Sequence, residues 1–282
     1  MKILIIGGTS SIGTALKNAF KESDEVITAG RDMCDITIDL TDPVGKIIFP
    51  NDIDIMIHTA AHFGGKKADE IIECENVNVQ GTLRLCRSAV GANVKHFVFI
   101  SSIFSTLDED SEHFGIYALS KKHAEEVAKF YCSVFSIPLT ILRPSQMYGN
   151  QNSFRKHQPF FYAMVDKAEK GEDILLYGNN DAIRNFIHVD DLVALIAFII
   201  ENKVEGEYSC MHPEDLTYSR IANAAIAAFN SKGTVHFLKD KTDIENNIFL
   251  KDHSLYEKIQ FYPRISIEEG MEMIATYRNT LH

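Results

Sequence analysis

Residues 3–13 form the stretch ILIIGGTSSIG, which decides the fold. Its four consecutive apolar residues predict a buried strand, and the positions that follow Gly13 have the spacing of a helix. Glycines between strand and helix permit a tight turn and a close backbone approach, so that a pyrophosphate can lie at the helix N-terminus. A plain glycine turn is the alternative. The position directly after the first strand favours a dinucleotide site.

Short apolar runs alternate with helical patterns through the first half of the chain. Further strands are expected at 25–29, 36–39, 55–58, 96–100 and 139–142, and long helices at 70–90 and 117–135. Near-continuous apolar strands that alternate with helices predict a parallel sheet covered on both faces. After Gly149 the pattern loosens, with helices expected near 160–170, 191–202, 218–229 and 267–280.

The sequence therefore predicts an α/β protein with a doubly wound parallel sheet of the Rossmann type and a smaller, mixed C-terminal lobe. We expect residues 1–150 to bind the dinucleotide, with some later segments returning to this domain. We expect residues 151–282 to bind the substrate.

The composition excludes several classes of function. The 282 residues carry 28 basic and 39 acidic side chains, a net charge of −11, which gives nucleic acids and anionic membranes no general attraction. The longest apolar run, 192–200, is too short to span a bilayer. Five cysteines without a CxxC pair favour free thiols in a reducing cytoplasm over disulfides or zinc. The histidines are scattered, and no metal site is expected.

Three polar residues are candidate catalytic residues. Tyr117 and Lys121 are spaced i, i+4, which places them on one face of a helix. A phenol with a pKa near 10 is a poor base at neutral pH, and a neighbouring ammonium stabilises the phenolate. Upstream, the strand at 96–100 runs into Ser102, whose hydroxyl could bind a substrate oxygen or simply cap the end of the strand.

This order of glycine turn, serine and Tyr-x-x-x-Lys resembles the extended short-chain dehydrogenase/reductase family, the nucleotide-sugar epimerase/dehydratase group. The resemblance covers nearly the whole chain. Further matching segments are HTAA at 58–61, NVQGT at 78–82, LRPSQMYG at 142–149, RNFIHVDD at 184–191 and SIEEGM at 266–271.

The resemblance implies a role for each matching position. Tyr117 is then the acid/base, Lys121 lowers its pKa and Ser102 polarises the reacting oxygen. Arg184 holds the substrate diphosphate, which suits its forked donors, or else forms a surface salt bridge. Gln146 stands where an asparagine commonly contacts the substrate. The cofactor contacts that the resemblance implies are Gly7, Ser10, Ser11, Ile12, Gly13, Arg31, Asp39, Leu40, Ala60, Asn78, Lys121 and Pro144.

The chain departs from the family at several points. Ser10 replaces the middle glycine, so its hydroxyl either crowds the phosphate or donates to it. The end of the second strand reads Gly30-Arg31-Asp32. If Arg31 faces the ribose, NADP is favoured; if Asp32 does, NAD is favoured. We expect NADP, with NAD as the alternative. If Arg31 is only a solvated loop residue, it has no role in the choice of cofactor.

The segment between the serine and the tyrosine is short and resembles that of short reductases in the family. No Asp-Glu pair comes directly after Ser102, where the next residues are Ile103 and Phe104, and this disfavours a sugar dehydratase. The leading hypothesis is an NADPH-dependent reductase of a 4-keto nucleotide sugar. The first alternative is an NAD-dependent nucleotide-sugar 4-epimerase that uses the same residues. The second is an NADP(H)-sensing regulator without catalysis. The resemblance also implies a homodimer that pairs through the helices at 70–90 and 117–135. The free thiols and the absence of a long apolar run predict a cytoplasmic protein.

Overall fold

The chain divides into two compact units, which we describe separately. The computed structural model describes residues 1–42 and 47–281. Unit 1 comprises residues 1–144, 193–210 and 252–259, and unit 2 comprises residues 145–192, 211–251 and 260–282. The first segment of unit 1 ends at Pro144, and two later segments belong to the same unit. That unit 1 binds the cofactor and unit 2 the substrate stays a prediction.

Unit 1 is built on a seven-stranded parallel sheet in the order β11-β6-β5-β4-β1-β2-β3. The strands are β1 (Lys2–Ile6), β2 (Glu25–Gly30), β3 (Ile36–Thr37), β4 (Ile55–His58), β5 (His96–Ile100), β6 (Leu139–Pro144) and β11 (Gly206–Cys210). Their side chains are mostly buried on both faces, as the continuous apolar runs predict. The strand order reverses between β1 and β4, which is where open parallel sheets bind ligands.

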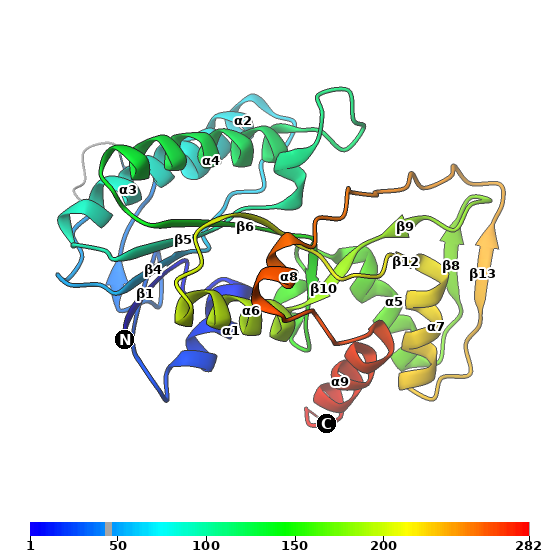
Figure 1. The fold of residues 1–282 in the computed structure, drawn as a ribbon. Helices are drawn as coiled ribbons and strands as arrows, with labels where there is room; N and C mark the ends of the chain where they lie inside the picture. The colour runs from blue at the N-terminus through cyan, green and yellow to red at the C-terminus, as the bar shows by residue number, and fades with distance from the viewer. Residues whose placement is uncertain (43–46, 282) are drawn as a thin grey trace. The chain divides into compact units, whose positions relative to one another are not determined.

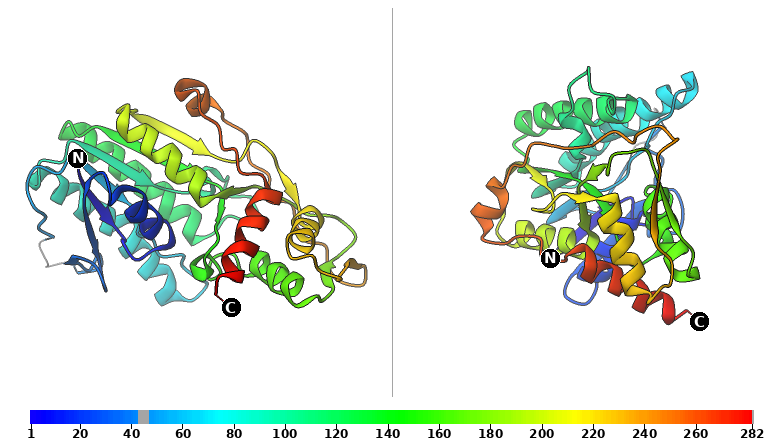
Figure 2. Two further views of the ribbon diagram at one scale, coloured as in Figure 1. Left: turned by 90° about the horizontal axis from the view of Figure 1, so that it is seen from below. Right: turned by 90° about the vertical axis from the view of Figure 1, so that its right-hand side faces the viewer.

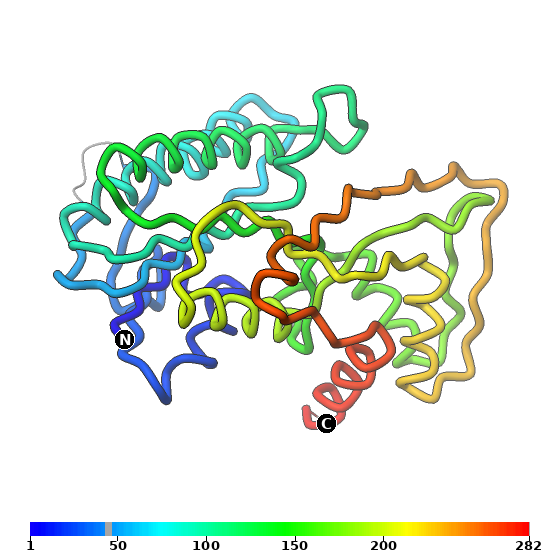
Figure 3. Tube along the Cα trace, viewed as in Figure 1, coloured from blue at the N-terminus to red at the C-terminus, as the bar shows by residue number. Residues whose placement is uncertain are grey.

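Helices cover both faces of this sheet, with α2, α3 and α4 over one face and α1 and α6 over the other (Figure 1). Their bounds are α1 (Ser11–Phe20), α2 (Ala68–Glu75), α3 (Gly81–Gly91), α4 (Ile116–Val134) and α6 (Val189–Glu201), of which α6 begins in unit 2. Figure 3 shows the chain returning to unit 1 after residue 193, to form β11, and again in the orange segment that contains α8 (Ser254–Ile259). The Rossmann-type prediction is confirmed.

The helix expected at 70–90 is interrupted. Between α2 and α3 the backbone of η1 (Asn76–Gln80) is a π-helix. Such an insertion widens one turn and often marks a functional position. Here it carries the buried Asn78. The spacing of apolar residues over 70–90 does not reveal that one turn is widened. The sequence therefore predicts a single helix over this range.

Unit 2 contains three pairs of short strands and three main helices. The pairs are β7 (Gln146–Tyr148) with β10 (Phe186–His188), β9 (Ile183–Arg184) with β12 (Leu216–Thr217), and β8 (Ile174–Tyr177) with β13 (Val235–Leu238). The helices are α5 (Pro159–Lys170), α7 (Tyr218–Ala228) and α9 (Ile267–Asn279), and α7 packs between the other two (Figure 2). Within the described residues no helix is long and apolar enough to cross a membrane.

Candidate active site

The glycine turn of unit 1 is tightly built. Gly7 has φ +83°, a conformation that favours glycine, and a Cβ there would lie 2.8 Å from the backbone nitrogen of Ala60. A Cβ on Gly13 would lie 2.2 Å from the Gly7 carbonyl oxygen, so α1 begins directly against the turn. The first turn of α1 contains no acidic residue. These features fit the pyrophosphate of a dinucleotide, which needs exposed backbone N–H groups and no side chain in the way.

Ser10 caps the helix. Its Oγ accepts a hydrogen bond from the Gly13 backbone N–H at 3.0 Å and lies 2.9 Å from Oγ1 of Thr59. The Thr59 hydroxyl in turn donates to the Ile6 carbonyl at 2.8 Å. The serine in place of the middle glycine therefore joins the ends of β1 and β4, a contact that the sequence does not reveal. Ser11 and Ile12 form the first turn of α1.

The end of β2 presents two charged side chains. Arg31 and Asp32 follow the strand directly, and both are exposed. Asp39 accepts hydrogen bonds from the backbone and hydroxyl of Thr41, which hold its pKa below the ordinary value, and the charges of Arg31 and Arg84 act in the same direction. Arg31 therefore carries its charge close to Asp39, another of the expected cofactor contacts. Which residue faces the ribose stays a prediction.

The segment after β4 connects the glycine turn to the catalytic helix. Asn78 accepts from the His62 backbone N–H at 2.8 Å and donates to the His62 carbonyl at 2.8 Å. Its amide also donates to Oγ of Ser120 at 2.9 Å, in the first turns of α4. The amide of Asn78 thus holds the segment that carries Ala60 against α4. A direct contact of Asn78 or Ala60 with the cofactor stays a prediction.

Ser102 and Tyr117 face each other. Ser102 caps the short 3₁₀ helix η2 (Ile103–Thr106) after β5, and Tyr117 is half-buried in the first turn of α4. Burial raises the pKa of Tyr117 to about 12, while the hydrogen bond with Ser102 acts in the opposite direction. The ring of Phe63 stacks on that of Tyr117, with centroids 4.8 Å apart. At neutral pH the phenol is therefore protonated.

Lys121 lies one helical turn further along α4 and is 1% exposed. Its Nζ donates to the Ile100 carbonyl at 2.9 Å and lies 4.7 Å from the centre of the Phe99 ring. Burial lowers the pKa of Lys121 to about 8, against the opposing effect of Glu125. The lysine is still mainly cationic at neutral pH. That its charge lowers the pKa of Tyr117 stays a prediction.

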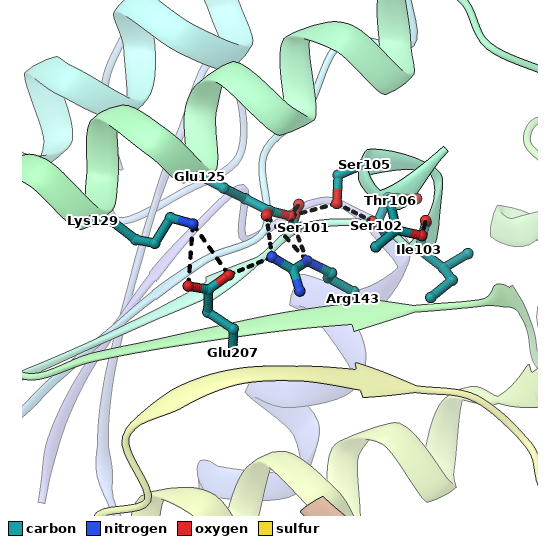
Figure 4. A network of polar contacts seen from close by, with 9 residues as sticks. All are labelled: Ser101, Ser102, Ile103, Ser105, Thr106, Glu125, Lys129, Arg143 and Glu207. Carbon is teal, nitrogen blue, oxygen red and sulfur yellow. Dashed lines mark hydrogen bonds and ion pairs between the residues drawn. The ribbon is translucent and has the colours of Figure 1, made fainter. Parts of the chain in front are cut away.

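A buried network lies beside these residues (Figure 4). Glu125, 3% exposed, accepts hydrogen bonds from the hydroxyls of Ser101 at 2.5 Å and Ser105 at 2.6 Å. The same carboxylate pairs with Arg143, whose NH2 group lies 2.6 Å from Oε2. Arg143 also contacts Glu207, at 2.5 Å. The network ties the residues around Ser102 to α4.

The two candidate substrate residues lie in unit 2. Arg184 is 7% exposed, donates through NH1 to the carbonyls of Ile183 and Glu245, and lies over the ring of Tyr218 at 5.0 Å. The alternative of a surface salt bridge is therefore wrong, because the guanidinium is buried against carbonyls and an aromatic ring. Gln146 donates to the side chain of Gln158 at 3.1 Å. Contacts of Arg184 and Gln146 with a substrate stay predictions.

Two features of the site are not evident from the sequence. Glu125 is spaced i, i+4 from Lys121, so its helical face could be inferred, but a glutamate on a helix gives no sign of burial. Phe63 carries no motif at all, and only the structure shows its ring on Tyr117. Pro144, a predicted cofactor contact, ends β6, where it pairs with Cys210.

The fold and the site define a class. Residues 3–210 match the family model described as "NAD dependent epimerase/dehydratase family", and the chain belongs to that family. It is an enzyme of the extended short-chain dehydrogenase/reductase type, as the motifs predict.

The chain is also similar to particular proteins of known name. The chain is 26% identical over 216 residues to CDP-abequose synthase of Salmonella typhimurium, covering 72% of this chain and 71% of that protein. It is 27% identical over 224 residues to UDP-glucose 4-epimerase of Vibrio cholerae, covering 71% and 66%. The crystal structure of a UDP-glucuronic acid 4-epimerase variant from Bacillus cereus, in complex with UDP-4-deoxy-4-fluoro-glucuronic acid and NAD, superposes with a TM-score of 0.80 at 18% identity and covers 100% of both chains. This likeness confirms the fold.

Proposed function

We propose that this protein is a nucleotide-sugar 4-epimerase that uses NAD. One observation carries the proposal: Ser102, just after β5, is grouped with Tyr117 and the buried cation of Lys121 on α4. Asn78 links α4 to the segment that contacts the glycine turn. A hydride-transfer enzyme needs an acid/base beside its nicotinamide site, and this arrangement supplies one.

The residues of this chain divide the work as follows. A bound nicotinamide supplies the hydride acceptor and donor. Tyr117 acts as a base only after it has lost its own proton: the phenolate takes the proton of the sugar 4-hydroxyl and later returns it. Ser102 holds the same oxygen through its hydroxyl. Lys121 provides the positive charge that favours the phenolate, because opposite charges at short range stabilise each other in a buried site.

Two further points support an epimerase. Several relatives with this fold are named 4-epimerases. The residues after Ser102 are Ile103, which is buried, and Phe104, so the part of the chain that the structure describes places no carboxyl pair at this point for eliminating water. The leading sequence-based hypothesis, a 4-keto reductase, has less support from these relatives. The regulator hypothesis is disfavoured because Ser102, Tyr117 and Lys121 are all in place.

One observation favours the reductase as a second candidate. Burial keeps Tyr117 protonated, which suits a group that donates a proton to a ketone oxygen, and Arg31 is exposed at the end of β2, where it could accept a 2′-phosphate. The two candidates share every catalytic residue and differ in whether the cofactor is retained or consumed.

Chromatography of the supernatant after denaturing the purified protein separates the candidates. Near-stoichiometric NAD is expected, because an epimerase recycles a retained cofactor. A protein that releases no nucleotide and binds NADPH more tightly than NADH would overturn the epimerase proposal in favour of the reductase. Binding of neither nucleotide would overturn both.

We also propose that two copies pair through α2, α3 and α4 and that the protein is cytoplasmic. Large apolar side chains are exposed on these helices, among them Ile72 (59%), Phe130 (74%) and Val134 (59%). Burying this surface against a second copy would remove it from water. The five cysteines are free, in accord with a reducing compartment.

A further inference from the structure

The Glu125 carboxylate joins two elements that each carry part of the proposed acid/base pair. Its own helix, α4, carries Tyr117, and the turn at 101–105 carries Ser102. From the turn, the hydroxyls of Ser101 and Ser105 both donate to Oε1 of Glu125.

The turn at 101–105 is also held by hydrogen bonds within itself. The Ser105 hydroxyl also lies within hydrogen-bond distance of the Ser102 carbonyl, at 2.8 Å, and the Ser105 backbone N–H donates to that carbonyl at 3.0 Å. Ser105 therefore connects the backbone of Ser102 directly to the carboxylate. Figure 4 shows Ser102 next to Ser105 in this turn. The Ser102 side chain hydrogen-bonds with Tyr117.

We propose that Glu125 is a positioning residue, which fastens the turn at 101–105 to α4 and so places the Ser102 hydroxyl at the Tyr117 phenol. The inference rests on the proposed function only for its effect on turnover, since the placement itself is a property of the folded chain.

Arg143 compensates the charge of the buried Glu125 carboxylate. It meets both oxygens of Glu125 through Nε and NH2, at distances from 2.6 to 3.1 Å. A buried carboxylate without such a partner would be strongly disfavoured. Arg143 supplies the opposite charge, while Oε1 also accepts from the two hydroxyls of the turn. Glu207 and Lys129 continue the network toward solvent.

The same carboxylate acts on Lys121. Glu125 raises the pKa of Lys121 against the lowering effect of burial. The other titratable groups that face Lys121 are Cys74 of α2, His58 of β4 and, on its own helix, Tyr117. His58 is neutral because burial lowers its pKa to about 3, and burial raises the pKa of the Cys74 thiol. Glu125 is therefore the group that keeps Lys121 cationic toward higher pH.

Two variants separate the tether from the charge. Glu125→Gln removes the charge and also sets an amide N–H against a guanidinium or hydroxyl donor, so it weakens both functions. The double variant Ser101→Ala/Ser105→Ala removes the tether and keeps the buried Glu125–Arg143 pair, which protects against loss of folding. Glu126→Gln is the matched control, because Glu126 is the next residue on α4 and is exposed.

The first readout is independent of activity. In protein labelled with ¹³C at tyrosine Cζ, the Tyr117 signal is assigned with Tyr117→Phe, and its change in Ser102→Ala defines loss of the hydrogen bond. We expect Glu125→Gln and Ser101→Ala/Ser105→Ala to change this signal in the same direction as Ser102→Ala, and Glu126→Gln to leave it in place. A Tyr117 signal that matches wild type in both tether variants would overturn the proposal.

The second readout is kinetic and electrostatic. We expect kcat to fall about 100-fold in Glu125→Gln and about tenfold in the double serine variant, with KM nearly unchanged. The pKa of Lys121, followed by NMR of lysine Cε, should fall by about one unit in Glu125→Gln and stay in place in the double serine variant. Unchanged kcat in both variants of an active enzyme would overturn the proposal. If wild type turns over no nucleotide sugar while the Tyr117 signal moves as expected, the proposed function fails and the positioning stands.

Discussion

The catalytic group of unit 1 and the candidate substrate residues of unit 2 are organised differently. In unit 1 the side chains contact one another: Ser102 meets Tyr117, and Glu125 meets the turn around Ser102. In unit 2, Arg184 and Gln146 have separate partners, which are carbonyls and an aromatic ring for the first and another glutamine for the second. The unit 1 side chains form one connected network, whereas Arg184 and Gln146 have separate partners. Changes in the two units should therefore have different kinetic consequences.

Removing the phenol should have the largest effect. Tyr117→Phe is expected to lower kcat by about 100- to 10,000-fold, the range ascribed to a positioned acid/base, and to leave cofactor affinity within a factor of two or three. Steady-state kinetics and cofactor titration measure the two. Tyr131→Phe, the same change further along α4, is the control and should retain full activity. Unchanged turnover in Tyr117→Phe would refute the mechanism.

Removing the buried guanidinium of Arg184 should act on substrate binding instead. Arg184→Ala is expected to raise KM by roughly ten- to 100-fold with little change in kcat, because hydrogen bonds to a charged group are lost without disturbing Tyr117. Cofactor affinity should be unchanged. Arg155→Ala is a useful control, since Arg155 pairs with Asp166 elsewhere in the same unit. A loss of kcat at unchanged KM would contradict a role for Arg184 in holding substrate.

Lys121 should leave a signature in the pH dependence of stability. Its pKa is lowered from 10.5 to about 8, so the native state binds fewer protons than the unfolded state between these values. The destabilisation from the buried charge is fully present below pH 8 and is lost as the pH rises toward 10.5. The free energy of unfolding of wild type should therefore rise relative to Lys121→Met across this window, as measured by denaturant titration. A constant difference between the two proteins would mean that Lys121 is not desolvated in this way.

A change to the exposed apolar surface of the helices should affect dimerisation and have little effect on cofactor binding. Phe130→Asp places a charge in the proposed interface and is expected to shift sedimentation velocity from dimer to monomer. Cofactor affinity should change by less than about twofold. Lys122→Asp, an exposed change on the same helix, is the control. A wild-type protein that sediments as a monomer would contradict the proposed dimer.

The difference between the two units also explains what the sequence can predict. Most strand and helix positions in unit 1 follow from apolar runs. Gly7 and Ser102 each follow a predicted strand, and Tyr117 and Lys121 have the i, i+4 spacing of one helical face. The contacts of Glu125 are not predictable in this way, because they join α4 to a turn and to Arg143 on β6. In unit 2, two partners of Arg184, Tyr218 and Glu245, lie far along the chain, and no spacing rule connects them with it.

Transfer of deuterium tests the central claim most directly. A panel of UDP- and CDP-hexoses labelled with deuterium at C4 is incubated with the protein, and the products are separated and examined by mass spectrometry and NMR. The account predicts a 4-epimer that retains its deuterium at C4, because the hydrogen leaves and returns as a hydride within one site, and predicts no such product from Tyr117→Phe. A 4-epimer that carries solvent hydrogen at C4 would contradict hydride transfer, and oxidation of added NADPH without any epimer would contradict the epimerase.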